Sequence, residues 1–166
     1  MGDFTDNRLL GELSYALFYN DGIVSWYVDL TEGTIVSIVD DYLNEEKCSE
    51  QFPIPQWEKD YIKDAKKTLK HELMEILPKP SYISFGIMES FAATCTEKQQ
   101  KSLFDALSKK HPFSRFRQTV ERIGILQEWY DFKNKEELYF AKKWLKVENL
   151  AIQDGKIIRV SVDLSE

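Results

Sequence analysis

Residues 25–39 constrain the fold of this chain most strongly, because they carry the pattern of a β-hairpin. The sequence SWYVDL at residues 25–30 alternates large apolar side chains with other residues, which is the period of a half-buried strand. The sequence TIVSIV at residues 34–39 is rich in β-branched side chains and predicts the return strand. The connection between them ends in Gly33, which suits a hairpin loop whose last residue needs a positive φ.

Helical spacing dominates the rest of the chain. Leucines and alanines predict a first helix over residues 7–19. A longer stripe, from Trp57 through Leu69 and Leu73 to Ile76, predicts a helix that starts near Gln56 and ends before Pro78. Further helices are predicted over residues 82–94, 97–109, 112–123, 125–132 and 135–149.

Local signals mark the beginnings of three of these helices. Thr96 with Gln99, and Asn134 with Glu137, have the spacing of a capping box, in which each side chain bonds the other residue's backbone N–H. Pro112 suits the first turn of a helix, where its missing N–H would have no partner. In the helix over 112–123, an apolar stripe that includes Phe113 and Phe116 predicts the buried face.

The end of the chain changes period again. After a turn at Asp154-Gly155, residues 158–164 alternate apolar and polar side chains and predict a strand. A lone hairpin is marginally stable in water, so this strand is expected to add to the N-terminal hairpin as a third antiparallel strand. The predicted class is therefore α+β: an N-terminal helix and hairpin, a helical C-terminal half, and the tail strand.

Length and composition fit one domain over residues 1–166. Residues 7–55 would hold the helix, the hairpin and an acidic loop, residues 56–150 would be helical, and 151–166 would form the tail. Apolar residues make up 43% of the chain, enough for a packed core and against disorder. No run is long enough to span a membrane, no secretion signal opens the chain, and Cys48 and Cys95 have no paired spacing. We expect a cytoplasmic protein with two reduced thiols.

The residue types that carry catalysis are sparse. His71 is predicted on the polar side of the helix from Gln56, and His111 lies just before Pro112; neither stands in a nucleophile motif. The carboxylates of Asp40, Asp41, Glu45 and Glu46 match neither a calcium loop nor a two-metal pattern. The seven glycines never cluster, so no phosphate-cradling loop is predicted. We expect no catalytic residue, no metal and no cofactor.

Charge is distributed unevenly, and this suggests an anion-binding surface. Residues 1–60 carry 3 basic and 13 acidic side chains, whereas residues 101–146 carry 11 basic and 6 acidic ones. Arg115 and Arg122 are seven residues apart and share one helix face, with Gln118 and Thr119 between them, so they could bind phosphates or carboxylates. Lys133, Lys142 and Lys143 would extend this surface. The residues favour the other interpretation, in which the arginines pair internally with acidic residues such as Glu121, Asp131 or the Asp40-Asp41 loop.

Several segments together resemble an uncharacterised bacterial protein family of unknown function, one of the numbered UPF families. They are the sequences WYVDLTEGTIV at 26–36, FPIP at 52–55, IMESF at 87–91, KKHPFSRFRQTV at 109–120, EWYDFK at 128–133 and AKKWL at 141–145. The resemblance covers roughly residues 7–150. Arg117 stands where the family usually has Lys, which keeps the charge, and the tail after residue 150 would be an addition. The resemblance implies a small bacterial cytoplasmic protein and brings no activity or cofactor.

Two classes of function remain open from the residues. The first is a non-catalytic protein-binding or adaptor module that meets another protein through a charged face, in keeping with the charge asymmetry. The second is a nucleic-acid-associated regulatory protein that uses the basic helices. A pI near 5.1 is far from the basic balance of a dedicated nucleic-acid binder, which favours the first.

Overall fold

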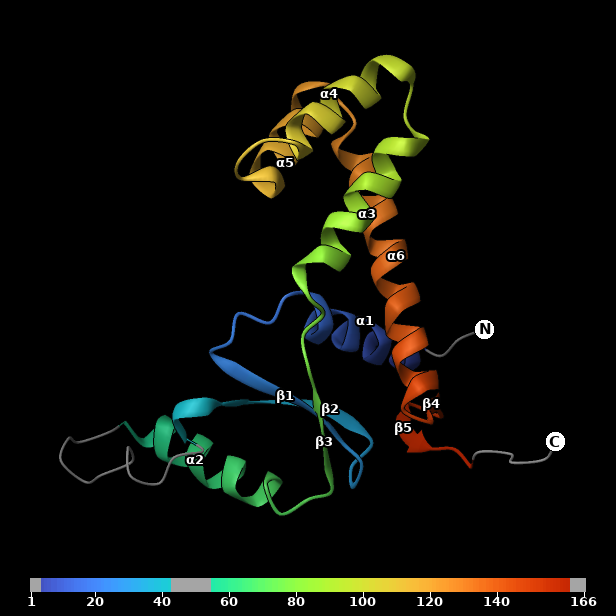
Figure 1. Cartoon of the computed structure of the whole chain (residues 1–166). Coiled ribbons are helices and arrows are strands. Elements are labelled where there is room, and N and C mark those ends of the chain that lie inside the picture. Colours follow the sequence, from blue (N-terminus) through green and yellow to red (C-terminus); the bar gives the residue numbers. More distant parts are fainter. Residues whose placement is uncertain (1–3, 43–54, 162–166) are drawn as a thin grey trace. The chain divides into compact units, whose positions relative to one another are not determined.

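A computed structural model describes residues 4–42 and 55–161, and it has the predicted α+β class (Figure 1). The chain divides into two compact units: residues 1–78 together with 141–166, and residues 79–140. That the whole chain folds as one cooperative domain stays a prediction. In the described ranges, no helix has both the length and the apolar character needed to cross a membrane.

The first unit contains the predicted hairpin. Strands β1 (Val24–Asp29) and β2 (Thr34–Val39) pair antiparallel, with Val24 opposite Val39 and Asp29 opposite Thr34. The turn closes through a 2.7 Å bond from the Gly33 N–H to the Asp29 carbonyl, and Gly33 has a φ of 75°. The predicted positive φ at Gly33 is therefore confirmed.

The predicted helix from Gln56 to Ile76 is wrong in its second half. Helix α2 (Gln56–Thr68) ends eight residues early, and residues Leu73–Ile76 form strand β3, which pairs antiparallel with β1. The sheet order is β2-β1-β3. The apolar stripe continues at helical spacing through Leu73 and Ile76, but these residues satisfy their backbone groups against β1, a pairing distant in sequence that local periodicity does not reveal.

The tail was also misplaced. Strand β4 (Leu150–Gln153) and strand β5 (Lys156–Arg159) pair with each other in a separate two-stranded sheet, so β3 and not the tail is the third strand of the first sheet. The predicted turn at Asp154-Gly155 is confirmed, since both residues have positive φ. An alternating pattern identifies a strand and its faces but leaves its partner open.

The core of the first unit gathers residues from both ends of the chain. Helix α1 (Phe4–Phe18) buries one apolar face, and this face packs with side chains of β1, β3, the end of helix α6 (Leu126–Val147), β4 and β5. The fully or nearly fully buried members are Leu9, Leu13, Ala16, Leu17, Val28, Ile76, Ala141, Leu145, Leu150 and Ile157. Two polar contacts support this packing: the Gly155 N–H bonds the Asp6 carboxylate at 2.7 Å, and the Ile157 N–H bonds the Gly33 carbonyl at 2.8 Å.

The second unit is helical. It comprises α3 (Ser81–Thr94), α4 (Glu97–Leu107), α5 (Pro112–Arg122) and the first part of α6. The capping box of Thr96 and Gln99 is present at the start of α4, and Pro112 occupies the first turn of α5. His111, which directly precedes Pro112, is the N-cap residue of α5 and has a left-handed conformation.

One predicted break is absent. Residues 125–132 and 135–149 were predicted as separate helices, but α6 runs unbroken from Leu126 to Val147. Asn134 lies inside it, and Glu137 is 4% exposed with its carboxylate 3.4 Å from the Lys133 ammonium, one turn away. The capping-box spacing predicted a helix start here, whereas Glu137 instead meets a cation on its own helix.

Aromatic rings fill the centre of the second unit. Phe116 and Trp129 are buried and their ring centroids lie 4.9 Å apart, while Phe91 contacts Phe116, Trp129 and Phe132. These contacts confirm the predicted burial of Phe116 and show that Trp129 lies in the core beside it. Phe113 was predicted to share this burial and does not: it is 45% exposed and meets only the edge of the Phe85 ring, at 6.5 Å, among the described ring contacts.

Candidate anion-binding site

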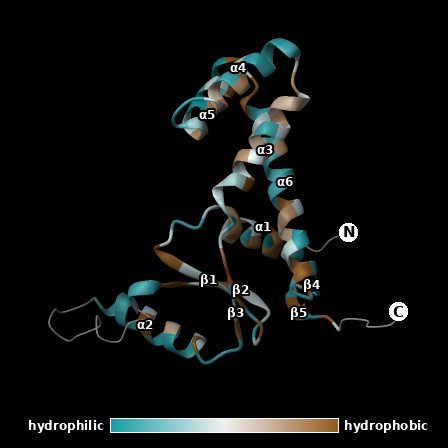
Figure 2. Ribbon diagram, in the orientation of Figure 1, coloured by the Kyte–Doolittle hydropathy of each residue, from teal (hydrophilic) through white to brown (hydrophobic). Residues whose placement is uncertain are grey.

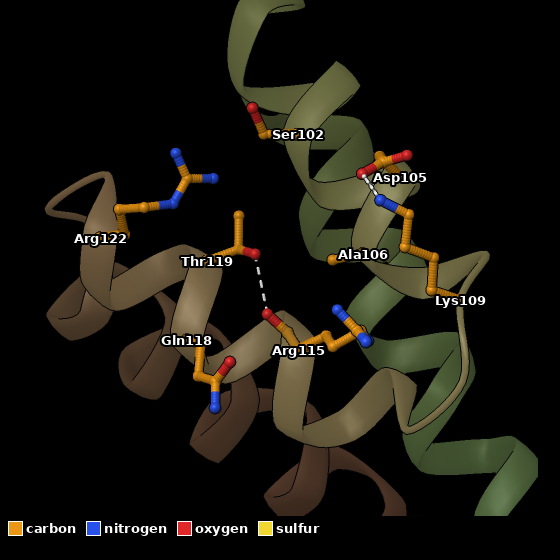
Figure 3. Close-up of a pocket in the computed structure, with 8 residues that line it drawn as sticks. All are labelled: Ser102, Asp105, Ala106, Lys109, Arg115, Gln118, Thr119 and Arg122. Atoms are coloured by element: carbon orange, nitrogen blue, oxygen red, sulfur yellow. Dashed lines mark hydrogen bonds and ion pairs between the residues drawn. The ribbon is translucent and has the colours of Figure 1, made fainter.

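A hollow lies between α4 and α5 within the second unit (Figure 3). Its volume is about 280 Å³, and Figure 2 colours much of these two helices as hydrophilic. Both arginines singled out in the sequence line it. The complete lining is Ser102, Asp105, Ala106, Lys109, Arg115, Gln118, Thr119 and Arg122.

Local bonds fix the orientation of Arg115. Its Nε donates a 2.8 Å hydrogen bond to the Lys110 carbonyl, in the turn between α4 and α5. One helical turn further along, the Thr119 hydroxyl donates to the Arg115 carbonyl, also at 2.8 Å. A guanidinium carries five N–H donors. Among the described residues only Nε of Arg115 is engaged, so its two terminal nitrogens can meet an anion in a preset orientation.

The internal pairing considered for the arginines does not occur in the part of the chain that the structure describes. The ion pairs found there include neither Arg115 nor Arg122. Asp131, one of the predicted partners, accepts a hydrogen bond from Gln127 at 2.9 Å instead. The hollow does contain one ion pair of its own, between Lys109 Nζ and Asp105 Oδ2 at 2.8 Å.

The three lysines predicted to extend this surface do not line the hollow. Lys133 borders a smaller, apolar pocket of about 50 Å³ beside Met88 and Trp129. Lys142 and Lys143 are exposed on the part of α6 that belongs to the first unit. The structure therefore places Arg115 and Arg122 on the lining of one hollow and places these lysines elsewhere.

Sequence reasoning missed the contribution of α4 and the turn after it. Ser102, Asp105 and Lys109 are spaced three and four residues apart, so they share one helix face, which is a readable signal. Their mixed chemistry gave no reason to connect them with the arginines of α5. Only the antiparallel return of the chain, set by the four residues between Leu107 and Pro112, places the two faces opposite each other.

His71 is positioned differently from its prediction. It lies after the end of α2, and its Nδ1 is 2.7 Å from Oδ2 of Asp29, whose side chain is 2% exposed. The other oxygen of Asp29 accepts the backbone N–H groups of Thr31 and Glu32 at 3.0 and 3.1 Å. Both oxygens of this buried carboxyl group therefore have hydrogen-bond partners. The contact between Asp29 and His71 links the hairpin turn to the segment that leads into β3.

Acidic and thiol groups offer no assembled metal site in the described ranges. No group of three or more His, Cys, Asp or Glu residues is placed there to hold an ion. Asp40 and Asp41 form part of a short 3-10 helix, whereas Glu45, Glu46, Cys48 and most of the link at 52–55 lie outside the described residues. Cys95 is a free thiol whose pKa is raised by burial, an effect that a hydrogen bond with Thr94 partly opposes.

The fold and the hollow define an α+β protein with a basic helical surface. The chain belongs to the uncharacterised protein family UPF0158, whose sequence profile matches residues 4–165. The family predicted from the sequence segments is therefore confirmed as an uncharacterised one, and the tail after residue 150 falls inside the match. No curated protein and no solved structure matches the chain.

Proposed function

We propose that this protein is a non-catalytic protein-binding or adaptor module of the bacterial cytoplasm, and that the hollow between α4 and α5 receives acidic side chains of its partner. The observation that carries the proposal is the pair of arginines on one face of α5. Both line the hollow, and neither takes part in an ion pair among the described residues. Arginine in this state is the residue best suited to bidentate recognition of carboxylates.

The surrounding charge supports the same proposal. Residues 97–122, which span both helices and their connection, carry seven basic and three acidic side chains. This local excess stands in a chain whose net charge is −6. A confined basic surface on an acidic protein attracts an acidic partner to one place and repels it from the rest.

The test measures binding of labelled poly-glutamate by fluorescence anisotropy at low ionic strength. Wild type is compared with Arg115→Glu/Arg122→Glu and with the control Lys66→Glu/Lys67→Glu, which makes the same change of charge on the exposed face of α2. Wild type and the control should bind, and the arginine variant should not. Equal loss in both variants would reduce the effect to net charge and contradict the proposal.

A nucleic-acid-associated regulator is the second candidate, and the exposed side chains of α5 favour it. Arg115, Arg117 and Gln118 are exposed on the first turns of a helix that follows another after a short turn. Arginine and glutamine are the side chains that most readily read guanine and adenine edges, and helix-turn-helix proteins present the start of their second helix to DNA.

Salt dependence separates the two candidates. If α5 contacts two phosphates, the logarithm of the association constant for a labelled DNA oligonucleotide should fall with the logarithm of salt concentration with a slope of about −2. A tagged pull-down divided into nuclease-treated and untreated halves complements this measurement. Partners that survive nuclease treatment support the adaptor, and partners present only without nuclease support the regulator.

A further inference from the structure

The two arginines of the hollow lie far apart along α5. Seven residues separate them, which corresponds to a rise of about 10 Å along the helix axis. Figure 3 shows Arg115 and Arg122 at opposite ends of the lining of α5, with Thr119 between them. Two positive groups so placed suit two separate anionic groups, one at each end of the hollow.

The middle of the hollow carries no net positive charge. Thr119 and Ala106, which lie between the two arginines in Figure 3, are uncharged. Asp105 and Lys109 lie at the Arg115 end and pair with each other at 2.8 Å. The pattern along the hollow is therefore positive, neutral, positive. A uniform polyanion places charge at every step, but its middle charges meet only the uncharged Ala106 and Thr119 and gain no charge pair there. A protein segment can place its carboxylates only at the two ends.

We infer that the hollow binds an α-helix of a partner protein that carries two carboxylates seven residues apart and no acidic residue between them. Residues seven apart on a helix share one face and have the same rise as Arg115 and Arg122 on α5, so a helix aligned with α5 meets both guanidinium groups at once. This inference rests on the proposed function, because it specifies which acidic partner the same hollow takes.

The test uses two alanine-rich helical peptides of equal composition and charge. One carries glutamates seven residues apart, and the other carries them five apart, so that they lie on different faces. The first should bind about five-fold more tightly, the effect of one additional exposed charge pair. Arg115→Gln and Arg122→Gln should each remove this preference, whereas Lys66→Gln on α2 should keep it.

A third peptide adds a glutamate midway between the two at spacing seven. Wild type should bind it no more tightly than the two-glutamate peptide, because the lining midway between the arginines, Thr119 and Ala106, carries no cation. If wild type gains affinity from the third glutamate, the hollow recognises plain negative charge density and the inference is overturned.

The outcomes also separate this inference from the proposed function. Equal binding of the spacing-seven and spacing-five peptides, with poly-glutamate still bound through Arg115 and Arg122, overturns the helical pattern and retains the acidic partner. Loss of arginine-dependent poly-glutamate binding removes both. Binding of a DNA oligonucleotide through these arginines, with no peptide binding, overturns the inference in favour of nucleic acid.

Discussion

The two units of this protein are stabilised by different kinds of contact. The first unit, residues 1–78 with 141–166, has an aliphatic core and depends on contacts between residues distant in sequence, such as Asp29 with His71. The second unit, residues 79–140, packs helices around aromatic rings, and consecutive helices are neighbours. Their charges differ as well: the first holds 12 basic and 20 acidic residues, and the second 10 and 8.

Polar side chains have different roles in the two units. In the first unit, a carboxylate is buried and fully bonded, so it contributes to structure. In the second unit, two guanidinium groups are exposed beside a hollow and have no carboxylate partner among the described residues. A polar group whose bonds are complete stabilises the fold, and one with unused donors at the surface is a candidate for recognition.

The largest expected effect is on the aromatic centre of the second unit. Phe116→Ala removes a fully buried ring and should lower the free energy of unfolding by about 3–5 kcal/mol. Phe113→Ala, on the same helix but 45% exposed, should lower the free energy of unfolding much less. Urea unfolding measures both variants, and hydrogen exchange should locate the added exchange of Phe116→Ala within residues 79–140. Equal costs for the two rings would contradict the assigned burial.

Removal of the buried carboxylate tests the corresponding contact of the first unit. Asp29→Ala leaves the Thr31 and Glu32 N–H groups and His71 without their acceptor and should cost about 3 kcal/mol. Asp64→Ala, on an exposed position of α2, is the matched control and should change the free energy of unfolding little. If both variants unfold alike in urea, Asp29 does not stabilise the hairpin turn.

The hairpin turn gives the third prediction. Gly33 has a φ of 75°, and a Cβ there would lie 2.6 Å from Cβ of Lys156, so Gly33→Ala should destabilise the protein by about 2 kcal/mol. Gly11 lies inside α1 with open space around it, and Gly11→Ala should stabilise by about 0.5–1 kcal/mol. The midpoint temperatures of thermal unfolding of the two variants should therefore shift in opposite directions. Shifts of the same sign would contradict the close approach of Lys156 in β5 to Gly33.

The smallest effect concerns the chemistry of one thiol. Because burial raises the pKa of Cys95, a smaller fraction is thiolate at about pH 8 than in a free cysteine. In a Cys48→Ser variant, alkylation of Cys95 by iodoacetamide should be slower than that of N-acetylcysteine, and its rate should rise over a higher pH range. Mass spectrometry follows the reaction, and an equal or faster rate would contradict the raised pKa.

Most signals confined to one segment predicted the structure well, and the capping-box spacing of Asn134 and Glu137, which lies inside α6, is the exception. The hairpin with its Gly33 turn, the capping box at Thr96, and Pro112 at the start of α5 were all identified because each depends on a few adjacent residues. Arg115 and Arg122 were likewise recognised as sharing a face from spacing alone.

Predictions that depended on distant partners were wrong. The strand at Leu73–Ile76 continues a helical stripe and is distinguished only by its pairing with β1. The tail strand pairs with residues 150–153 instead of the hairpin. Asp105 and Lys109 became part of the candidate site only through the packing of α4 against α5. Periodicity constrains faces, whereas partners are selected by packing across the fold.

The hydrogen bond between Gly155 and Asp6 joins residues 149 positions apart, and this has a consequence for synthesis on the ribosome. Chains emerge from the N-terminus and fold as units while translation proceeds. The contacts of α1 with β4 and β5 cannot form until residues 150–159 have been made, whereas residues 79–140 are complete earlier. The segment inserted in the middle of the sequence is thus available to fold first, and the unit that begins the chain is finished last.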